Sequence, residues 1–141
     1  MAGKYGSSSV TISLEDAPGG TARAVTNFIL EMGGVKVTAN TEQSNAFGDA
    51  WEEHTPTGMR KVDPITLSGF WDTTATTGPH VVFITPDSDP NGDGRELVVV
   101  FGDGKTFTVD VRLISYNVMG QNGNLTRFEA ELLPTGAGAW T

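Results

Sequence analysis

The sequence predicts a mainly β protein: an antiparallel β-sandwich or barrel with one short flanking α-helix and one long loop. Eighteen glycines are spread along 141 residues, and many short segments alternate β-branched apolar residues with Thr or Ser. Such alternation puts every second side chain on one face of a strand, and glycine suits the tight turns between strands. The chain has no internal repeat and no change in composition, so we expect a single domain over residues 1–141.

Four segments in the first half of the chain have the pattern of strands. Residues 10–14 and 65–71 alternate apolar residues with Thr or Ser. Residues 24–32 are strand-like with some helical character, and a Gly-Gly pair then turns the chain into a strand over 35–39. The segment 41–64, which separates these strands from 65–71, is expected to be the long loop.

A short helix is expected near residue 79. Pro79 suits the first position of a helix, and Thr76 or Thr77 lies close enough to cap it. The β-branched residues that follow, beginning with Val81 and Val82, favour a helix of few turns.

The second half of the chain contains the clearest local unit, a β-hairpin followed by one more strand. Residues 97–101 form a strand, 102–105 a turn and 106–116 the returning strand, and 125–133 form the last strand. Period-two alternation directs one set of side chains into the core: Phe107, Val109, Val111, Leu113, Phe128, Ala130 and Leu132. It directs the other set outward: Thr108, Asp110, Arg112, Arg127, Glu129 and Glu131.

Composition and charge exclude several classes of function. Seventeen acidic against nine basic residues give a net charge of -8, so binding nucleic acid by attraction to its phosphates is not expected. Because the chain has no cysteine, disulfides, thiolate metal sites and cysteine nucleophiles are excluded. No segment resembles a signal peptide or a membrane span, so we expect a protein kept on the cytoplasmic side, without a membrane partner.

One motif resembles a metal site. Residues 87–94 match positions 1, 3, 5 and 6 of a helix–loop–helix calcium loop. Position 12, which needs a bidentate Glu, is Val98, and Asp, Asn and Gly also favour a plain solvated turn. We therefore expect at most an adventitious cation between Asp87 and Asp93, and no cofactor.

Catalytic motifs are absent from the sequence, so we expect no enzyme activity. His54 and His80 lie outside any nucleophile pattern and are expected to be polar loop residues. Residues 102–106 resemble a phosphate loop but join two strands, so they are expected to form a hairpin turn. Two carboxylate pairs, Glu52 with Glu53 and Glu129 with Glu131, lack the apolar pocket that would raise the pKa of one member.

Residues 44–72 are the most unusual stretch. Two of the three Trp and two of the seven Phe lie among many charges here, which favours a surface built for contact with another chain. The alternative is a long loop whose Phe47 and Trp51 pack back onto the core of their own chain.

Short motifs in a fixed order connect this chain with a known family. They lie at residues 46–53 (AFGDAWEE), 56–58 (PTG), 65–72 (ITLSGFWD), 76–79 (TTGP), 123–130 (GNLTRFEA) and 134–136 (PTG). Together they resemble the major tail tube proteins of long, non-contractile-tailed bacteriophages and of related prophage and gene-transfer particles. The resemblance covers nearly the whole chain, from Lys4 to Gly136.

The resemblance implies a structural virion protein that is assembled in the host cytoplasm and resides in the tail. Six copies would form a ring, and stacked rings would form a hollow tube through which the genome passes without specific binding. Its other implied partners are a tape measure protein, a tail terminator and distal tail or baseplate proteins. The loop 41–64 and the flexible arms 1–9 and 135–141 would bridge subunits. The expected contact residues are Phe47, Asp49, Trp51, Glu52, Glu53, His54, Arg60 and Lys61.

The acidic charge of the chain suits such a conduit. An acidic wall repels phosphates, so DNA would slide along it without sticking. Solvent-side carboxylates are the candidates for that wall: Glu42, Asp110, Glu129 and Glu131. The alternative is that these acids lie on the outside of the tube and keep it soluble.

A second function remains open. The chain is also consistent with a monomeric β-sandwich that binds carbohydrate or decorates a surface. Such a module would present an aromatic platform, which Trp51, Trp71 or Trp140 would supply.

Overall fold

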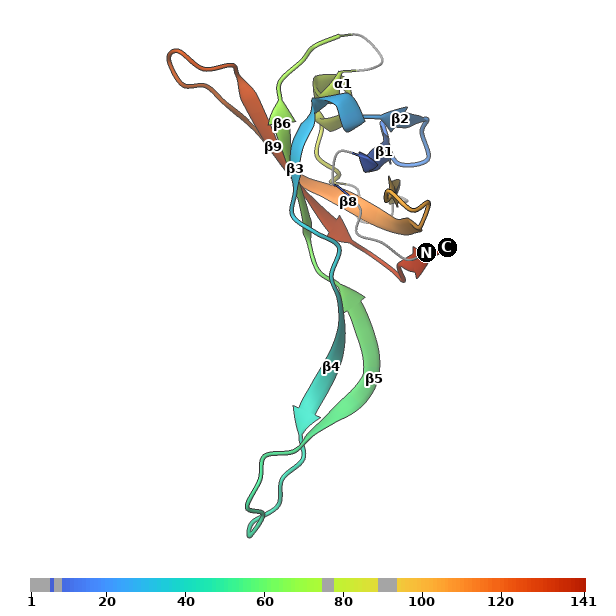
Figure 1. Cartoon of the computed structure of the whole chain (residues 1–141), viewed down its shortest axis with the longest axis vertical. Helices are drawn as coiled ribbons and strands as arrows, with labels where there is room; N and C mark the ends of the chain where they lie inside the picture. The colour runs from blue at the N-terminus through green and yellow to red at the C-terminus, as the bar shows by residue number, and fades with distance from the viewer. Residues whose placement is uncertain (1–5, 7–8, 75–77, 89–93) are drawn as a thin grey trace.

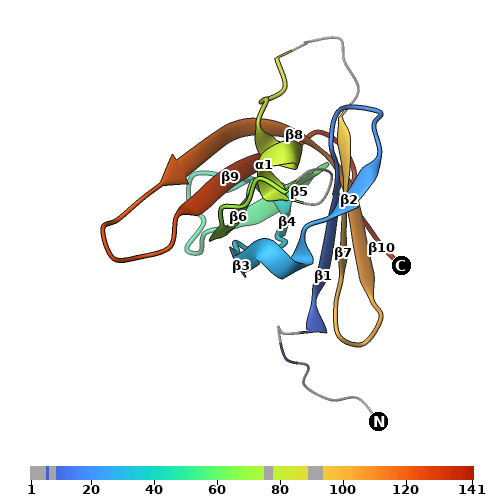
Figure 2. The same cartoon turned by 90° about the horizontal axis from the view of Figure 1, so that it is seen from above.

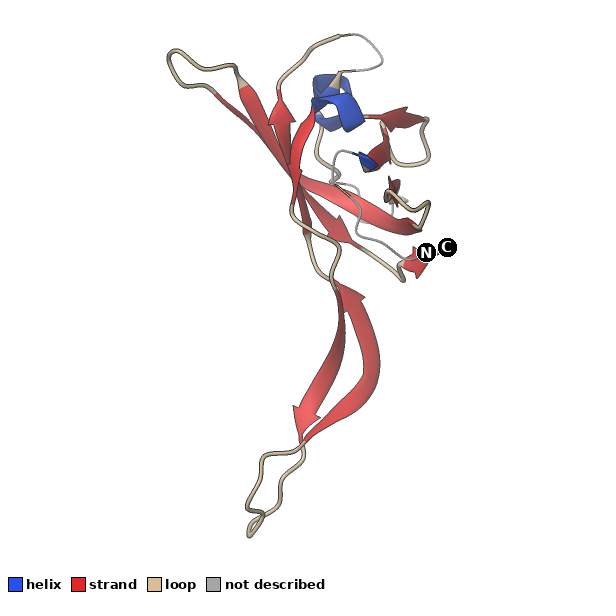
Figure 3. Ribbon diagram, viewed as in Figure 1, coloured by secondary structure: helices blue, strands red, loops and turns tan. Residues whose placement is uncertain are grey.

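The structure is a computed structural model that describes residue 6 and residues 9–74, 78–88 and 94–141. The strands are β1 Thr11–Glu15, β2 Ala22–Ala24, β3 Ile29–Met32, β4 Val37–Gln43, β5 His54–Val62, β6 Ile65–Phe70, β7 Arg95–Val100, β8 Thr106–Met119, β9 Arg127–Pro134 and β10 Ala139–Trp140. A 3-10 helix, η2, covers Thr26–Phe28, and the α-helix α1 covers Pro79–Phe83. The mainly antiparallel β class with one short helix is confirmed (Figure 3).

One antiparallel sheet forms the body of the molecule (Figure 1). Its strand order is β2-β1-β7-β8-β9-β6-β3, and β10 pairs with the start of β8. The first part of β8 pairs with β7, its second part pairs with β9, and the register shifts between Leu113 and Ser115. A bulge bends a strand, so the sheet folds around its core, and in Figure 2 β1 and β7 run across the direction of β9.

The core lies on the inner side of this bent sheet. All seven side chains expected to point inward from β8 and β9 are buried. They meet Leu14, Leu67 and Leu97 from the other strands and Val82 and Phe83 from α1. The Phe83 and Phe128 rings stack with their centroids 5.4 Å apart. The helix therefore closes the core on the side that the sheet leaves open.

The segment expected to be a long loop is a β-hairpin. Strands β4 and β5 pair with each other and form a separate two-stranded sheet, which projects from the body as a long arm (Figure 1). Of the residues in β5, only Val62, at the base, is buried. The loop prediction for 41–64 is therefore wrong: regular strands occupy half of it, and residues 44–53 form the irregular tip.

Other local predictions are partly corrected. The helix begins at Pro79 as expected, but its N-cap is Gly78, without a side-chain cap, and Thr76 and Thr77 lie outside the described residues. Residues 24–32 contain the end of β2, the helix η2 and β3, which explains their mixed pattern. Of the two expected arms, 135–141 includes β10, whereas most of 1–9 lies outside the described residues.

Candidate assembly surfaces

The tip of the β4–β5 hairpin is held by its own polar side chains. The Asn45 side chain donates to the Trp51 carbonyl at 3.1 Å and accepts from the Glu53 amide at 2.7 Å. Asp49 accepts from the amide of Ala46 at 2.7 Å. Because these bonds close the tip without any contact to the body, its shape is set locally. Asp49, expected to be a contact residue, thus has a structural role within the tip.

Two large aromatic side chains stand free at this tip. Phe47 is fully exposed, and 83% of the Trp51 surface is exposed. The alternative in which both pack onto the core of their own chain is therefore wrong. Exposed aromatic residues of this size, grouped on a projecting element, are typical of a surface that another molecule covers.

The structure divides the expected contact residues into two groups. Asp49, Glu52, Glu53 and His54 lie at or beside the tip with the two aromatics. Arg60 and Lys61 lie near the opposite end of β5, where they pair across the ribbon with Ala39 and Thr38 of β4. The hairpin therefore has an acidic, aromatic tip and a basic base, which spacing along the sequence did not indicate.

Lys36 joins the basic group at the base, and sequence reasoning missed it. Its ammonium lies 3.8 Å from Asp63, and the ammonium of Lys61 lies 4.0 Å from the same residue. One carboxylate thus faces two exposed ammonium groups, so the base keeps a net positive charge. The Gly-Gly turn before β4 gave no signal that Lys36 would share Asp63 with Lys61, because that arrangement depends on the hairpin register.

Three of the four acidic candidates share one face of the main sheet. Asp110, Glu129 and Glu131 lie on β8 and β9 and point away from the core, whereas Glu42 lies apart on the hairpin arm. Further acids join that face from neighbouring strands: Glu15, Glu31 and Glu96. These six carboxylates outnumber the two guanidinium groups there, Arg112 and Arg127, by four. The position of Glu96 on this face was predictable, because it lies opposite Asp110 in the β7–β8 hairpin and paired residues point to the same side of a sheet.

The calcium-like motif has a different role at its first residue. Asp87 and Arg95 form a buried ion pair at 3.0 Å, with 4% and 3% of their side chains exposed. The second carboxylate oxygen of Asp87 accepts from the Leu113 amide at 2.9 Å. Arg95 also donates to the carbonyls of Val82, at 2.6 Å, and Thr85. Both oxygens of Asp87 are therefore occupied, and the pair ties the end of α1 to β7 and β8. The rest of the motif, 89–93, lies outside the described residues.

The sequence suggested that His80 is a polar loop residue. The structure instead places it on α1, between two aromatic side chains. The indole of Trp71 donates to His80 Nδ1 at 3.3 Å, and the Tyr116 hydroxyl lies 3.1 Å from the same atom. An indole N–H only donates, so Nδ1 is the acceptor and the ring proton is on Nε2. Burial raises the pKa of Tyr116, partly offset by its contact with Trp71. These contacts therefore fix α1 against the sheet.

Trp140 is likewise engaged within the chain. Its ring lies 4.9 Å from Phe107 and 5.6 Å from Phe101, centroid to centroid. Because Trp71 is also engaged, through its hydrogen bond to His80, Trp51 is the one tryptophan that stands free of the body.

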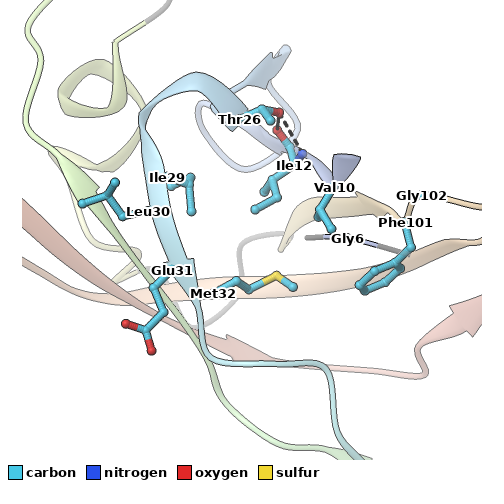
Figure 4. Close-up of a pocket in the computed structure, with 10 residues that line it drawn as sticks. All are labelled: Gly6, Val10, Ile12, Thr26, Ile29, Leu30, Glu31, Met32, Phe101 and Gly102. Carbon is cyan, nitrogen blue, oxygen red and sulfur yellow. Dashed lines mark hydrogen bonds between the residues drawn. The ribbon is translucent and has the colours of Figure 1, made fainter. Parts of the chain in front are cut away.

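Two open grooves flank the sheet. One, of about 520 Å³, is lined mainly by apolar side chains of β1, β3 and the turn after β7, including Ile12, Met32 and Phe101 (Figure 4). Among the residues that the structure describes there, Glu31 is the one that carries a charge. The other, of about 600 Å³, lies at the base of the hairpin, lined by Val37, Gly58, Arg60, Lys61 and residues 134–138.

Within 9–74, 78–88 and 94–141, no group of three or more His, Asp or Glu is placed to hold a metal ion. None of the helices in the described part of the chain is long and apolar enough to cross a membrane. Residues 102–105 form the expected turn between β7 and β8.

Several solved structures share this fold over their whole length. A chain from the tail of an empty gene transfer agent particle, refined with helical C6 symmetry, is 16% identical with a TM-score of 0.74, and the match covers 98% of this chain and 99% of that chain. A chain from the sheath–tube complex of an extracellular contractile injection system is 12% identical with a TM-score of 0.68, covering 98% and 91%. One from the sheath/tube terminator of that system is 12% identical with a TM-score of 0.71, covering 100% and 99%.

These matches establish the fold. The body, the short helix and the projecting arm together form the fold found in chains of a gene transfer agent tail and of injection-system tube complexes. No protein-family model matches the sequence, and no curated protein matches it. Because contractile systems occur among the structural matches, the fold does not distinguish a contractile from a non-contractile particle.

Proposed function

We propose that this chain is a structural subunit that self-assembles into stacked rings of six, forming the hollow tail tube of a phage-like particle. The full-length likeness to a chain from a tail with C6 symmetry supports this function. A tube of this kind is a conduit for the genome and needs no catalytic residues. The protein would be assembled in the host cytoplasm and reside in the tail of the particle.

The observation that carries the proposal is the hairpin arm. It buries almost none of its own residues, yet it ends in Phe47 and Trp51, both free of the body. Exposing two large aromatics to water costs about 2 kcal/mol or more for each, relative to burying them. A second copy of the chain that covers them would recover that free energy and would stabilise the assembly.

The acidic face of the sheet gives the tube its proposed lumen. Six copies that each turn this face inward would line the channel with carboxylates from Asp110, Glu129 and Glu131. Repulsion between those carboxylates and DNA phosphates would keep the genome from adhering to the wall. Glu42 lies on the arm, away from this face, so we assign it to a contact between subunits.

The ends of such a tube require other proteins. Chains with this fold occur in structures of a sheath/tube terminator, a tube-terminating cap and a baseplate. We propose that this chain likewise meets a terminator at one end of the tube and distal tail or baseplate proteins at the other, with a tape measure protein in the lumen during assembly.

Electron microscopy of the purified protein tests the function directly. The protein is concentrated stepwise, and each sample is examined by negative stain and by sedimentation velocity. We expect hollow rods or rings above a threshold concentration, with a sixfold end view. A protein that stays monomeric at every concentration would contradict the proposal and favour the alternative, a monomeric module that binds a ligand through Trp51.

A further inference from the structure

The arm carries opposite charges at its two ends. Glu42, Asp49, Glu52 and Glu53 make the outer end acidic, with no Lys or Arg between residues 41 and 54. At the inner end Lys36 and Lys61 face the single carboxylate of Asp63, and Arg60 lies next to Lys61 on β5. Within the described residues Arg60, Glu52 and Glu53 take part in no ion pair, so their charges are available to another molecule.

The basic end of the arm also has an open groove. The groove of about 600 Å³ lies between the base of the hairpin and the segment that leads into β10. Its apolar part includes Val37, which is about half exposed. Glycines at 58, 136 and 138 leave its walls without long side chains. A groove of this size accepts a group much larger than an indole.

The tip of an arm cannot reach the groove of its own chain. Strand β5 alone has nine residues and, at about 3.3 Å per residue, separates the two ends by roughly 30 Å. The tip and the base of the hairpin lie at opposite ends of the ribbon (Figure 1). The groove lies at that base, and its charge is opposite to that of the tip. A contact between them is possible only between two copies of the chain.

We propose that the acidic, aromatic tip of one copy docks in the basic groove at the hairpin base of a second copy. Trp51 would enter the groove, with Glu52 and Glu53 facing Arg60 and Lys61. This inference rests on the proposed tube and names the acceptor site of its arm. The other groove suits the tip less well, because Glu31, the one charged residue among its described lining residues, repels the acidic tip.

Such a contact has a direction. The tip and the groove are different surfaces, so each copy offers one of each, and the contact leaves a free tip at one end and a free groove at the other. A heterologous contact that does not close on itself produces an open polymer. Between subunits of neighbouring rings, this docking would add one layer of subunits after another, as a growing tube requires.

A charge swap tests the pairing. Arg60→Glu and Glu52→Lys are each made alone and then combined, and the concentration needed for assembly is measured by sedimentation in low salt. We expect each single change to raise that concentration about tenfold, because like charges then face each other. The combined variant should return to within about threefold of the unmodified protein. The matched control combines Glu52→Lys with Lys105→Glu, which has the same net charge but reverses a residue in the β7–β8 turn, and it should not recover.

A steric variant tests the groove independently of charge. Gly136 has no atom within 4 Å of the position that a Cβ would occupy and has no positive φ, so Gly136→Phe should fold and fill the groove. We expect it to abolish polymers, whereas Gly120→Phe, in an equally open position on another loop, should leave assembly unchanged.

The outcomes separate this inference from the function on which it rests. If the unmodified protein forms tubes but the charge swap shows no recovery and Gly136→Phe assembles normally, the tip docks elsewhere and the inference is wrong. If the unmodified protein forms no polymer, both the inference and the proposed function are wrong. Recovery by the swap, together with loss of assembly in Gly136→Phe, supports both.

Discussion

At the scale of single residues, Gly69 and Arg95 lie at two positions where a helix packs tightly against the sheet. Gly69 is the second-last residue of β6 and lies against the 3-10 helix η2, so a Cβ there would collide with the backbone of Phe28. Arg95 lies at the second position, where its guanidinium donates hydrogen bonds to carbonyls at the end of α1. Both positions are required by close packing that no local pattern reveals.

We expect Gly69→Ala to lower the free energy of unfolding by about 2–3 kcal/mol, because the obstructing atoms belong to the backbone and must move. Urea denaturation measures this. Gly120→Ala is the control: its Cβ would meet no atom within 4 Å, so a change within about 0.5 kcal/mol is expected. Equal effects of the two substitutions would show that the η2 crossing is loose.

Arg95→Met should be among the most destabilising single changes in the chain. It leaves the Asp87 carboxylate buried without its cation, which costs about 3–5 kcal/mol. Arg23→Ala is the comparison, because the Arg23–Asp16 pair at 3.2 Å is partly exposed and its loss should cost at most about 1 kcal/mol. Thermal unfolding of both variants checks the order. A small effect of Arg95→Met would mean that α1 is held mainly by its apolar contacts.

At the scale of elements, the hairpin arm shows the limit of pattern reasoning. β4 and β5 carry a strand register that includes Thr38 opposite Lys61 and Glu42 opposite Thr55. Apolar alternation predicted the start of β4, within 35–39, but the residues beyond Ala39 lack it because neither face is buried. Period-two patterns report burial on one side of a strand. A ribbon exposed on both sides therefore has the composition of a loop.

We expect Trp51→Ala to leave the stability of the isolated chain within about 0.5 kcal/mol, since the side chain touches little of its own chain. It should nevertheless raise the concentration needed for assembly at least tenfold, as the loss of an interface anchor does. Trp140→Ala is the counterpart: it packs on Phe101 and Phe107 and should lower the melting temperature. Unfolding scans and sedimentation together check both. Normal assembly of Trp51→Ala would remove the arm from the interface.

At the scale of the whole molecule, the bent sheet separates a buried face from an acidic one. Strand parity predicted Asp110, Glu129 and Glu131 to be outside the core, and the structure places them on one face with Glu31 and Glu96. The sequence could not predict this grouping, because it depends on which strands are neighbours.

Reversing the charge of that face should change how assembled tubes interact with DNA. We expect tubes of Asp110→Lys/Glu129→Lys/Glu131→Lys to bind short DNA fragments in a strongly salt-dependent manner and to protect them from nuclease, whereas unmodified tubes bind none. Asp103→Lys, in the β7–β8 turn, is the control. Fragments that bind but remain fully sensitive to nuclease would place the acidic face on the outside of the tube.

The sequence by itself determined the β class, the core side chains of β8 and β9, the start of α1 and the aromatic character of the segment 44–53. Each follows from local physics: alternation reports burial, proline fixes a helix start, and free aromatics among charges indicate contact. The tertiary structure alone decided that 41–64 is a projecting ribbon, that Arg95 neutralises Asp87, and that the charges of the arm separate into an acidic tip and a basic groove. Those features depend on contacts between residues far apart in the chain, and strand pairing and register fix such contacts.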